Sequence, residues 1–409
     1  MACSRGDLLL LGLAAGGLVA SLLWTRQWGD ARPEGPKEDE EGPPQRGSEE
    51  KKKKKEKKKK EKKDDKPRSG TLGPAEAFKR RAVARGVAGG DESEITRRFP
   101  RRFELFGHVV VVKLNAGVSR GDFEECAAVF AESFAPRVVT VVLLDTVGIG
   151  GELREPQLHL LWKSATESIT MPKESLKYTL RQSCDPACVS PEDVKLFETC
   201  TDSLTFTTHI ENGVRYSFDV SKVMFCSGNG TERMHFSTIV AKDEVVVDMF
   251  AGIGYFTIPL AMHGGPKVIH ALEKNANSVT FLKYNAVQNK VSHVIRTYCG
   301  DNREVGSELC GKCDRVLMGY IPSCEEFLPR AVSFLKVSPN GNPIGTIHYH
   351  FLSDKNNAED TVRQHVKMSL GEDMVRLIHI NAIRIVKSYA PKRFHCVADL
   401  VFESSSSEE

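Results

Sequence analysis

The feature that most constrains the fold is a series of short apolar runs alternating with helix-like stretches, which begins at Val245. The first run, VVVD, ends at Asp248 and leads into a turn that contains Gly252 and Gly254. The next expected elements are a helix over 256–262, the strand KVIHALE, a helix over 276–289, and the strands VIRTYCGD and CDRVLMGYIP. Strands that alternate with helices at this spacing predict an α/β fold with a parallel, doubly wound sheet. Two long β-rich segments, MVRLIHINAIRIVKSYAP and KRFHCVADLVFE, predict an antiparallel hairpin at its edge.

Two smaller β-rich regions precede this sheet. The strand-like runs HVVVVKL and VVTVVLLD flank the helical stretch GDFEECAAVFAESF, which predicts a small α/β domain. Alternating residues on both sides of Asn212-Gly213 give a strong hairpin signal, which predicts a β-platform. We therefore divide the chain into an apolar segment 1–28, a disordered Lys/Glu-rich linker 29–72, an N-terminal α/β region 73–205, a β-platform and linker 206–240, a catalytic domain 241–404 and a disordered tail 405–409.

The first segment contains the uncharged apolar run LLLLGLAAGGLVASLLW over 8–24. We interpret it as a membrane anchor that leaves the rest of the chain in the cytosol. A cleaved secretory signal fits less well, because an odd count of 11 scattered cysteines indicates reduced thiols. A mitochondrial transit peptide is also disfavoured, since only Arg5 precedes the run and Asp7 adjoins it. The lysine run KKKKKEKKKKEKK in the linker either binds RNA or an anionic membrane, or is a solvated spacer.

Two cysteine pairs have spacings at which thiolates bind zinc, Cys184-x3-Cys188 and Cys310-x2-Cys313. Neither pair has a second pair nearby to complete a tetrahedral site. We therefore expect ordinary thiols and no metal.

The turn after Asp248 excludes two common kinds of phosphate site. A dinucleotide fingerprint needs a third glycine where Thr257 stands, and a P-loop needs Gly-Lys-Ser/Thr at the start of the helix. An acidic residue followed by Gly252 and Gly254 instead suits a ligand that carries an amino group and a sulfonium. In a doubly wound sheet such a ligand binds at the carboxyl ends of the strands.

The next two strands also end in polar residues. Glu273 is placed to accept both hydroxyls of a ribose, and Asp301-Asn302 to bind the adenine amino group and ring nitrogens. A simpler explanation is that such residues cap the helices that follow, which applies to Asp301 and Asn275. Capping alone does not explain an acid at three successive strand ends beside a glycine turn, and we therefore predict a nucleoside-type cofactor site.

These residues carry a resemblance. DMFAGIGYFTIPLA resembles the first motif of class I S-adenosylmethionine-dependent enzymes, and the longer string from FDVSKVMFCSGNGTER onward is similar to enzymes that modify the purine at position 37 of tRNA. The resemblance covers roughly Phe206 to Phe402. It implies a class I methyltransferase-like fold, S-adenosyl-L-methionine as cofactor and tRNA as partner.

The fourth strand distinguishes two branches of this group. Guanine-37 N1-methyltransferases carry a Met-Asn-Leu-Pro type sequence there, whereas DRVLMGYIPSCEE resembles the wybutosine-synthesizing aminocarboxypropyltransferases. Gly319 stands in place of the asparagine, and with Pro322 it marks the candidate catalytic strand end. The resemblance implies transfer of the 3-amino-3-carboxypropyl group to a tricyclic base at position 37 of tRNA(Phe). The alternatives left open are the N1-methyltransferase and a non-catalytic RNA-binding scaffold.

The string MFCSGNGTER supplies three further candidates. The resemblance implies that Cys226 and Arg233 contact the cofactor, where the family has Ser and Lys, and Arg233 would pair with the methionine carboxylate. Glu232 is a candidate base, or equally the partner of a nearby arginine. We expect a monomer whose tRNA phosphates contact basic side chains; the candidates are Arg97, Arg98, Arg101, Arg102, Lys222, Lys387, Lys392 and Arg393.

Overall fold

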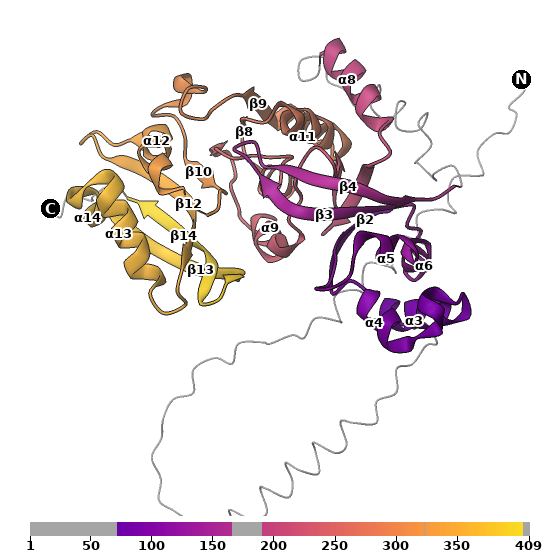
Figure 1. Ribbon diagram of the computed structural model, residues 1–409. Helices are drawn as coiled ribbons and strands as arrows, with labels where there is room; N and C mark the ends of the chain where they lie inside the picture. Colours follow the sequence, from indigo (N-terminus) through magenta and orange to yellow (C-terminus); the bar gives the residue numbers. More distant parts are fainter. Residues whose placement is uncertain (1–71, 166–189, 323, 404–409) are drawn as a thin grey trace, which may run out of the picture. The chain divides into compact units, whose positions relative to one another are not determined.

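The computed structural model describes residues 72–165, 190–322 and 324–403 (Figure 1). The apolar run 8–24, the lysine-rich linker, Cys184, Cys188 and the acidic tail lie outside these ranges. All described elements belong to one compact unit, Thr71–Glu409. Within those ranges, none of the helices combines the length and the hydrophobicity that crossing a membrane requires.

The first sheet has four strands in chain order. The pair β2–β3 is parallel, and the outer pairs are antiparallel. The strands are β1 (Arg102–Phe106), β2 (Val109–Lys113), β3 (Val141–Gly150) and β4 (Glu155–Lys163). The helices beside them are α3 (Pro74–Ala84), α4 (Glu92–Arg98), α5 (Arg120–Glu124) and α6 (Ala127–Glu132). Alternate residues of β2, Val110 and Val112, are buried with Phe123 and Phe130 of α5 and α6, which gives this sheet its own core.

A two-stranded hairpin follows helix α8 (Pro191–Thr201) and consists of β5 (Phe206–Glu211) and β6 (Val214–Asp219). Its turn residues Asn212 and Gly213 both have positive φ, +51° and +79°. Two positive φ values are what a type I′ hairpin turn requires. The hairpin predicted from the sequence is therefore confirmed, and it leads into the short helix η2 (Ser227–Asn229) and helix α9 (Gly230–Phe236).

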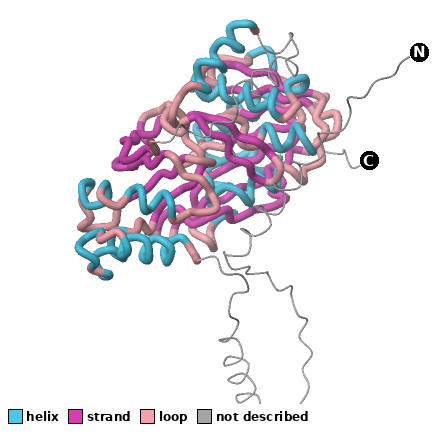
Figure 2. The backbone as a smooth tube through the Cα atoms, turned by 90° about the vertical axis from the view of Figure 1, so that its right-hand side faces the viewer, coloured by secondary structure: helices cyan, strands magenta, loops and turns pink. Residues whose placement is uncertain are grey.

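The large sheet has the order β13-β14-β12-β10-β7-β8-β9. The neighbours from β12 to β9 are parallel, and β14 is antiparallel to both β12 and β13. Its strands are β7 (Val245–Asp248), β8 (Val268–Glu273), β9 (Ile295–Cys299), β10 (Arg315–Met318), β12 (Pro343–Ser353), β13 (Ile378–Ala390) and β14 (Arg393–Phe402), and β11 (Lys336–Val337) pairs with β12 alone. The helices are α10 (Thr257–His263), α11 (Ala276–Gln288), α12 (Leu328–Phe334), α13 (Ala358–Leu370) and α14 (Glu372–Leu377). The alternation of strands and helices can be followed in Figures 1 and 2.

The strand order reverses between β7 and β10, because the chain runs outward from β7 to β9 and then returns to β10 on the other side. The carboxyl ends of these two strands are therefore the switch point at which a doubly wound sheet binds its ligand. Asp248 ends β7, and Gly319 follows β10 directly.

The two faces of β12 differ in polarity. Ile347, Tyr349 and Phe351 are buried in an apolar cluster that also contains Val362 of α13. The alternate residues His348 and His350 are also buried but face the other side of the sheet, since side chains alternate along a strand. One side of the C-terminal half is thus an ordinary core, and the other is a buried polar layer.

The predicted fold class is confirmed by these sheets. The predicted antiparallel hairpin at the edge of the large sheet is also confirmed, with β13 outermost and β14 between β13 and β12. One detail of the C-terminal part was wrong, because residues 374–377 form the end of α14 rather than a strand.

Candidate functional site

The acidic residue at the end of β7 holds the glycine turn. Oδ2 of Asp248 accepts a hydrogen bond from Oγ1 of Thr257 at 2.7 Å, and Oδ1 accepts one from the amide of Phe250 at 3.2 Å. The side chain is fully buried, and burial raises its pKa to about 7, against the effect of these two bonds. The sequence-based expectation of a direct ligand contact is therefore corrected, because Asp248 fastens the turn to the start of α10.

The two glycines of this turn are required by geometry. Gly252 and Gly254 have φ values of +54° and +97°, in the region that favours glycine. A Cβ on Gly252 would lie 2.4 Å from the Tyr255 ring, and one on Gly254 would lie 2.5 Å from Ile258. The two glycines thus allow the turn to pack directly against the side chains of Tyr255 and Ile258.

Glu273 at the end of β8 is fixed by backbone amides. Its Oε2 accepts the amide of Gly252 and its Oε1 the amide of Asn275, both at 2.8 Å. Burial raises the pKa of this carboxyl, and the backbone hydrogen bonds oppose that shift. Each carboxylate oxygen has a second lone pair, so Glu273 retains the capacity to accept two hydroxyls.

Two residues follow the end of β9, and they differ in their contacts. The Asp301 carboxylate is bound by basic side chains, whereas Oδ1 of Asn302 has no hydrogen-bond partner among the described residues. Asp301 is bound by Arg303 and Lys274, at 2.6 Å and 3.0 Å, and the Arg303 hydrogen bond holds its pKa well below the ordinary value. Asn302 donates from Nδ2 to the carbonyl of Met249 at 2.9 Å. Its Oδ1 is buried and has no hydrogen-bond partner among the described residues. A buried acceptor of this kind usually has a partner, and the amino group of an adenine supplies one.

These observations fit S-adenosylmethionine. Gly252, Glu273 and Asn302 come from three successive strand ends, and together they offer a glycine turn, a carboxylate that can accept ribose hydroxyls and a buried oxygen that can accept an adenine amino group. Since each of these groups is held by bonds to the turn itself, the site is preorganised.

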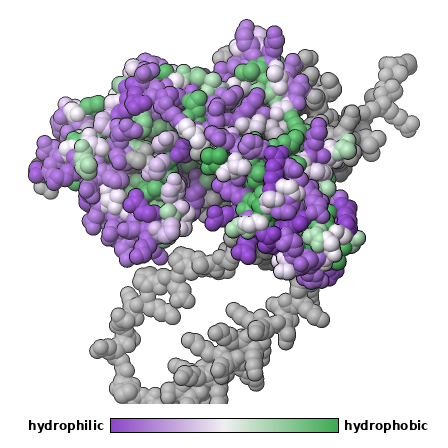
Figure 3. Space-filling view, viewed as in Figure 1, coloured by the Kyte–Doolittle hydropathy of each residue, from purple (hydrophilic) through white to green (hydrophobic). Residues whose placement is uncertain are grey.

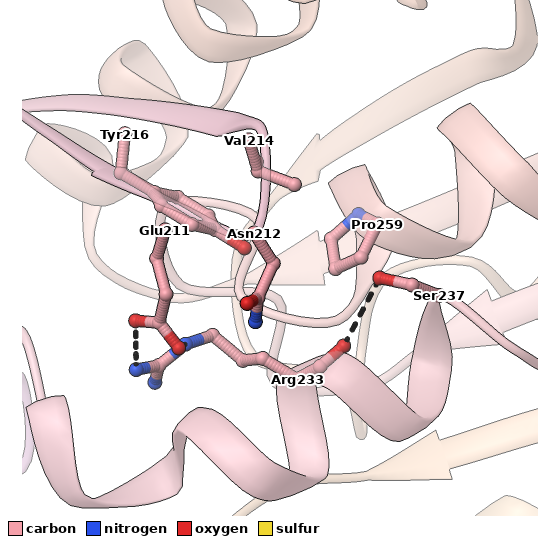
Figure 4. A pocket seen from close by; sticks show the side chains of 7 residues that line it. All are labelled: Glu211, Asn212, Val214, Tyr216, Arg233, Ser237 and Pro259. Carbon is pink, nitrogen blue, oxygen red and sulfur yellow. Dashed lines mark hydrogen bonds and ion pairs between the residues drawn. The ribbon is translucent and has the colours of Figure 1, made fainter. Parts of the chain in front are cut away.

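The segment after β6 is tied to the same turn. The hydroxyl of Tyr255 donates to the carbonyl of Met224, which fixes the approach to Cys226. Arg233 of α9 pairs with Glu211 of β5 at 2.6 Å (Figure 4). It also donates to the carbonyl of Cys226 at 2.8 Å. The Arg233 side chain is only 3% exposed. The expected partner, a methionine carboxylate, is therefore replaced by Glu211, which corrects the assignment of Arg233.

Glu232 also has a partner within the protein. Both of its oxygens accept hydrogen bonds from Arg384 of β13, at 2.9 Å and 3.2 Å, and its side chain is 3% exposed. Of the two interpretations left open by the sequence, the ion pair is the one observed. The structure thus shows Glu232 as the partner of Arg384 and not as a free carboxylate.

Cys226 lies beside a lysine. Its Sγ is 2.8 Å from Nζ of Lys387 on β13, and the thiol is partly exposed. The two residues are 161 positions apart in the sequence. The fold therefore brings together one residue expected at the cofactor and one expected at RNA.

Gly319 lies against an aromatic ring. A Cβ at this position would be 2.6 Å from Cε2 of Phe256. Phe256 is itself buried and packs on Phe236 and His350, with ring centroids 4.7 Å and 5.2 Å apart. The Phe256 ring thus fills the space that a side chain at position 319 would need. Pro322, two residues beyond Tyr320, is exposed, and no contact assigns it a role.

The basic RNA candidates fall into two groups. Arg98 is buried and pairs with Glu125 at 2.6 Å and Glu94 at 3.2 Å, so its assignment to RNA is wrong. Arg97 is exposed but pairs with Glu94 at 2.7 Å. The remaining candidates are partly or fully exposed: Arg101, Arg102, Lys222, Lys387, Lys392 and Arg393. Hydrophilic residues predominate on the molecular face shown in Figure 3.

An aromatic cluster at the switch point was missed from the sequence. The ring of Tyr320 stacks on Phe250 at 5.1 Å and 26°. The guanidinium of Arg154, between β3 and β4, lies 4.4 Å from the centre of the Tyr320 ring. The sequence signal for this cluster is that Phe250 and Tyr320 each lie two residues after a predicted strand end.

Among the described residues, no group of three His, Cys, Asp or Glu side chains is arranged to hold a metal. Of the pair Cys310 and Cys313, the first accepts a hydrogen bond from Arg330 at 3.4 Å and the second is buried.

Comparison with known proteins gives consistent matches. Residues 207–378 match the model of the TRM5/TYW2 methyltransferase domain. The tRNA(Phe) (4-demethylwyosine(37)-C(7)) aminocarboxypropyltransferase of Methanocaldococcus jannaschii is 40% identical over 64% of this chain and 86% of the relative. The protein of the same name from Pyrococcus horikoshii is 31% identical over 76% of this chain and 93% of the relative.

Solved structures extend the likeness to the fold. The structure of P. horikoshii TYW2 in complex with MeSAdo has a TM-score of 0.58 at 26% identity, and it covers 80% of this chain and all, 100%, of that chain. A complex of aTrm5 with tRNALeu has a TM-score of 0.57 at 22% identity over 83% of this chain and 81% of that chain, which indicates a shared fold.

Proposed function

Because this chain belongs to the family of tRNA(Phe) 4-demethylwyosine aminocarboxypropyltransferases, we propose that it transfers the 3-amino-3-carboxypropyl group of S-adenosylmethionine to the tricyclic wybutosine precursor at position 37 of tRNA(Phe). Methylthioadenosine is the second product. The chain is an S-adenosylmethionine-dependent transferase that acts in wybutosine biosynthesis.

The observation that carries this proposal is Gly319 against Phe256 at the end of β10. The Phe256 ring occupies the space that a side chain at 319 needs, with 2.6 Å left for a Cβ. An asparagine that orients a guanine for methylation therefore does not fit without displacement of a buried ring. This supports the aminocarboxypropyl branch over the N1-methyltransferase branch.

The protein's main task is orientation. When bound, the sulfonium of S-adenosylmethionine makes the adjacent carbons electrophilic, so no activation by the chain is needed. Glu273 and Asn302 hold the nucleoside, and the segment from Cys226 to Arg233 approaches the turn from the other side. Fixing the geometry of the reacting atoms accounts for a large part of such a rate enhancement.

The tRNA is bound through phosphates and by shape. Exposed guanidinium and ammonium groups neutralise phosphates, and structured RNA is read largely through its shape and its splayed-out bases. Arg101, Arg102, Lys222, Lys392 and Arg393 support this role by their exposure.

We also propose that the chain is a monomer in the cytosol, and the run 8–24 supports the further proposal that its N-terminal segment holds it at a membrane. Fractionation of cells that express the full chain and a variant without residues 2–28 tests this. Both forms in the supernatant would contradict a tether.

The transfer is tested with the purified full chain and tRNA(Phe) that bears the tricyclic precursor. S-adenosylmethionine is labelled either in the methyl group or in the carboxyl carbon. We expect carboxyl label in the tRNA together with released methylthioadenosine.

The other results separate the alternatives. Methyl label in the tRNA with adenosylhomocysteine would establish a methyltransferase. Binding of tRNA with no transfer of either label and no binding of S-adenosylmethionine would leave a non-catalytic RNA-binding scaffold.

A further inference from the structure

A β-bulge in β13 places two basic side chains on one face. Arg384 is opposite Val397 and Lys387 is opposite His395, with a register shift between Ile385 and Lys387. Residues three apart in a regular strand face opposite sides, but Val397 and His395 are two apart and share a face. The bulge therefore directs both Arg384 and Lys387 toward the segment of Cys226 to Arg233, which both of them contact. Bulges near active sites often re-aim a side chain in this way.

Three basic side chains contact or belong to the segment 226–233: Arg233, Arg384 and Lys387. The two arginines are paired with carboxylates of the protein. Arg384 is held between Glu232 and Asp399, with both carboxylates bonded in a bidentate manner. Arg233 is held by Glu211 and by the carbonyls of Cys226 and Ser227. Neither guanidinium has its charge available for a ligand.

Lys387 differs from both. Within the described part of the chain, no carboxylate oxygen lies within 4.0 Å of its ammonium, whose one protein partner there is Sγ of Cys226 at 2.8 Å. Glu104 of β1 interacts with the ammonium only electrostatically, from beyond that distance. An ammonium has three donors, so two remain free. The lysine stem lies along Gly228, where a Cβ would be 3.2 Å from Cδ of Lys387, so the side chain is held in place while its charge has no direct partner.

We propose that Lys387 binds the carboxylate of the transferred aminocarboxypropyl group, the role that the sequence suggested for Arg233. This assignment rests on the proposed use of S-adenosylmethionine. It reassigns Lys387 from RNA phosphate to the substrate's amino-acid end, and it gives the β13 bulge a function. The charge-assisted hydrogen bond fixes the arm whose carbon reacts.

The test compares two ligands by calorimetry on the full chain. Decarboxylated S-adenosylmethionine keeps the sulfonium and the amino group but lacks the carboxylate. In K387M, the Kd for S-adenosylmethionine is expected to rise about tenfold or more, while the Kd for the decarboxylated ligand stays unchanged. The matched control is K355M, which removes an exposed lysine from the loop after β12 and should alter neither Kd.

Other results overturn the assignment. An equal effect of K387M on both ligands, or weaker tRNA binding with an unchanged ratio of the two Kd values, would return Lys387 to a structural or phosphate-binding role. If K387M melts at a lower temperature than the wild type, K387Q is measured in its place. If wild-type protein binds neither ligand, the proposed function itself fails, and this assignment fails with it.

Discussion

At the scale of single residues, the site is defined as much by missing side chains as by present ones. Gly252 and Gly254 let the turn pack against Tyr255 and Ile258, and Gly319 leaves space for Phe256. The glycines of the turn were recognisable in the sequence, because a positive φ there follows from a known kind of loop. The partner of Gly319 was not, since Phe256 lies on another element.

A side chain at 319 should be poorly tolerated. We expect G319A to lower the free energy of unfolding by roughly 1–3 kcal/mol, because the added Cβ meets a ring that is itself packed on Phe236 and His350. Chemical denaturation measures this change. G121A is the control, since a Cβ on Gly121 of α5 has only Ser119 Oγ nearby, at 3.9 Å. Equal stability of both variants would show that the ring moves freely.

Cys226 should report occupancy of the site. Iodoacetamide is expected to alkylate the thiol in the free protein, and saturating S-adenosylmethionine should slow that reaction severalfold if Cys226 contacts the cofactor, as the sequence resemblance implies. Mass spectrometry of the labelled peptides gives the rate, with the exposed Cys299 and Cys310 as internal controls. Equal protection of all three thiols, or of none, would contradict the placement of Cys226.

At the scale of elements, the sequence revealed β7, β8, β9 and β10 because each is a short apolar run that ends at a polar residue. Strand β12 was not predicted, since His348 and His350 interrupt its apolar pattern. These histidines belong to the buried polar layer, in which His348 bonds to Asp399 at 2.7 Å and Asp399 to Arg384. A polar layer of this kind depends on partners from three strands, and no local pattern identifies them.

Asp399 should carry much of the stability of this layer. Burial alone raises its pKa, but hydrogen bonds from His348 and Arg384 hold the pKa well below the ordinary value. We expect D399N to lower the free energy of unfolding by about 3–5 kcal/mol at pH 7, because it leaves Arg384 short of a buried counter-charge. D373N is the control, as the Asp373 side chain is 98% exposed.

The loss of stability caused by D399N should depend on pH. The folded pKa of Asp399 lies below the unfolded value of about 3.9, so the ionised carboxylate stabilises the fold above that pH. This contribution is lost as the pH falls toward the folded pKa. The difference between wild type and D399N should therefore shrink below about pH 4. A difference that stays constant down to about pH 3 would exclude the ionised pair as its source.

At the scale of the whole molecule, the sequence predicted a cofactor domain with an N-terminal α/β region and a basic surface, but not which arginines serve structure. Arg97, Arg98, Arg101 and Arg102 look equivalent in sequence, and only the fold shows that Arg98 is buried among carboxylates. Whether an arginine of this group is exposed depends on α5, which lies farther along the sequence and supplies partners for the Arg98 side chain.

Two exposed members of that group, Arg101 and Arg102, should contribute to tRNA affinity. Replacing Arg101 and Arg102 by glutamine is expected to reduce the slope of log K against log salt concentration by about 0.7–0.9 for each phosphate that is no longer neutralised. Binding is measured by filter retention at several salt concentrations. A double variant of Arg363 and Arg376, exposed residues of α13 and α14, is the control. An unchanged slope would exclude Arg101 and Arg102 from the RNA interface.

The contacts made by the β13 bulge also have a temporal consequence. Arg384 follows Glu232 by 152 positions, and Lys387 follows Cys226 by 161. During synthesis the glycine turn and α9 leave the ribosome long before β13 does, and until then Glu232 lacks its partner Arg384. The nascent chain therefore completes these contacts only near the end of translation, and a transcript that breaks off before codon 384 encodes a protein with the recognisable motifs but without them.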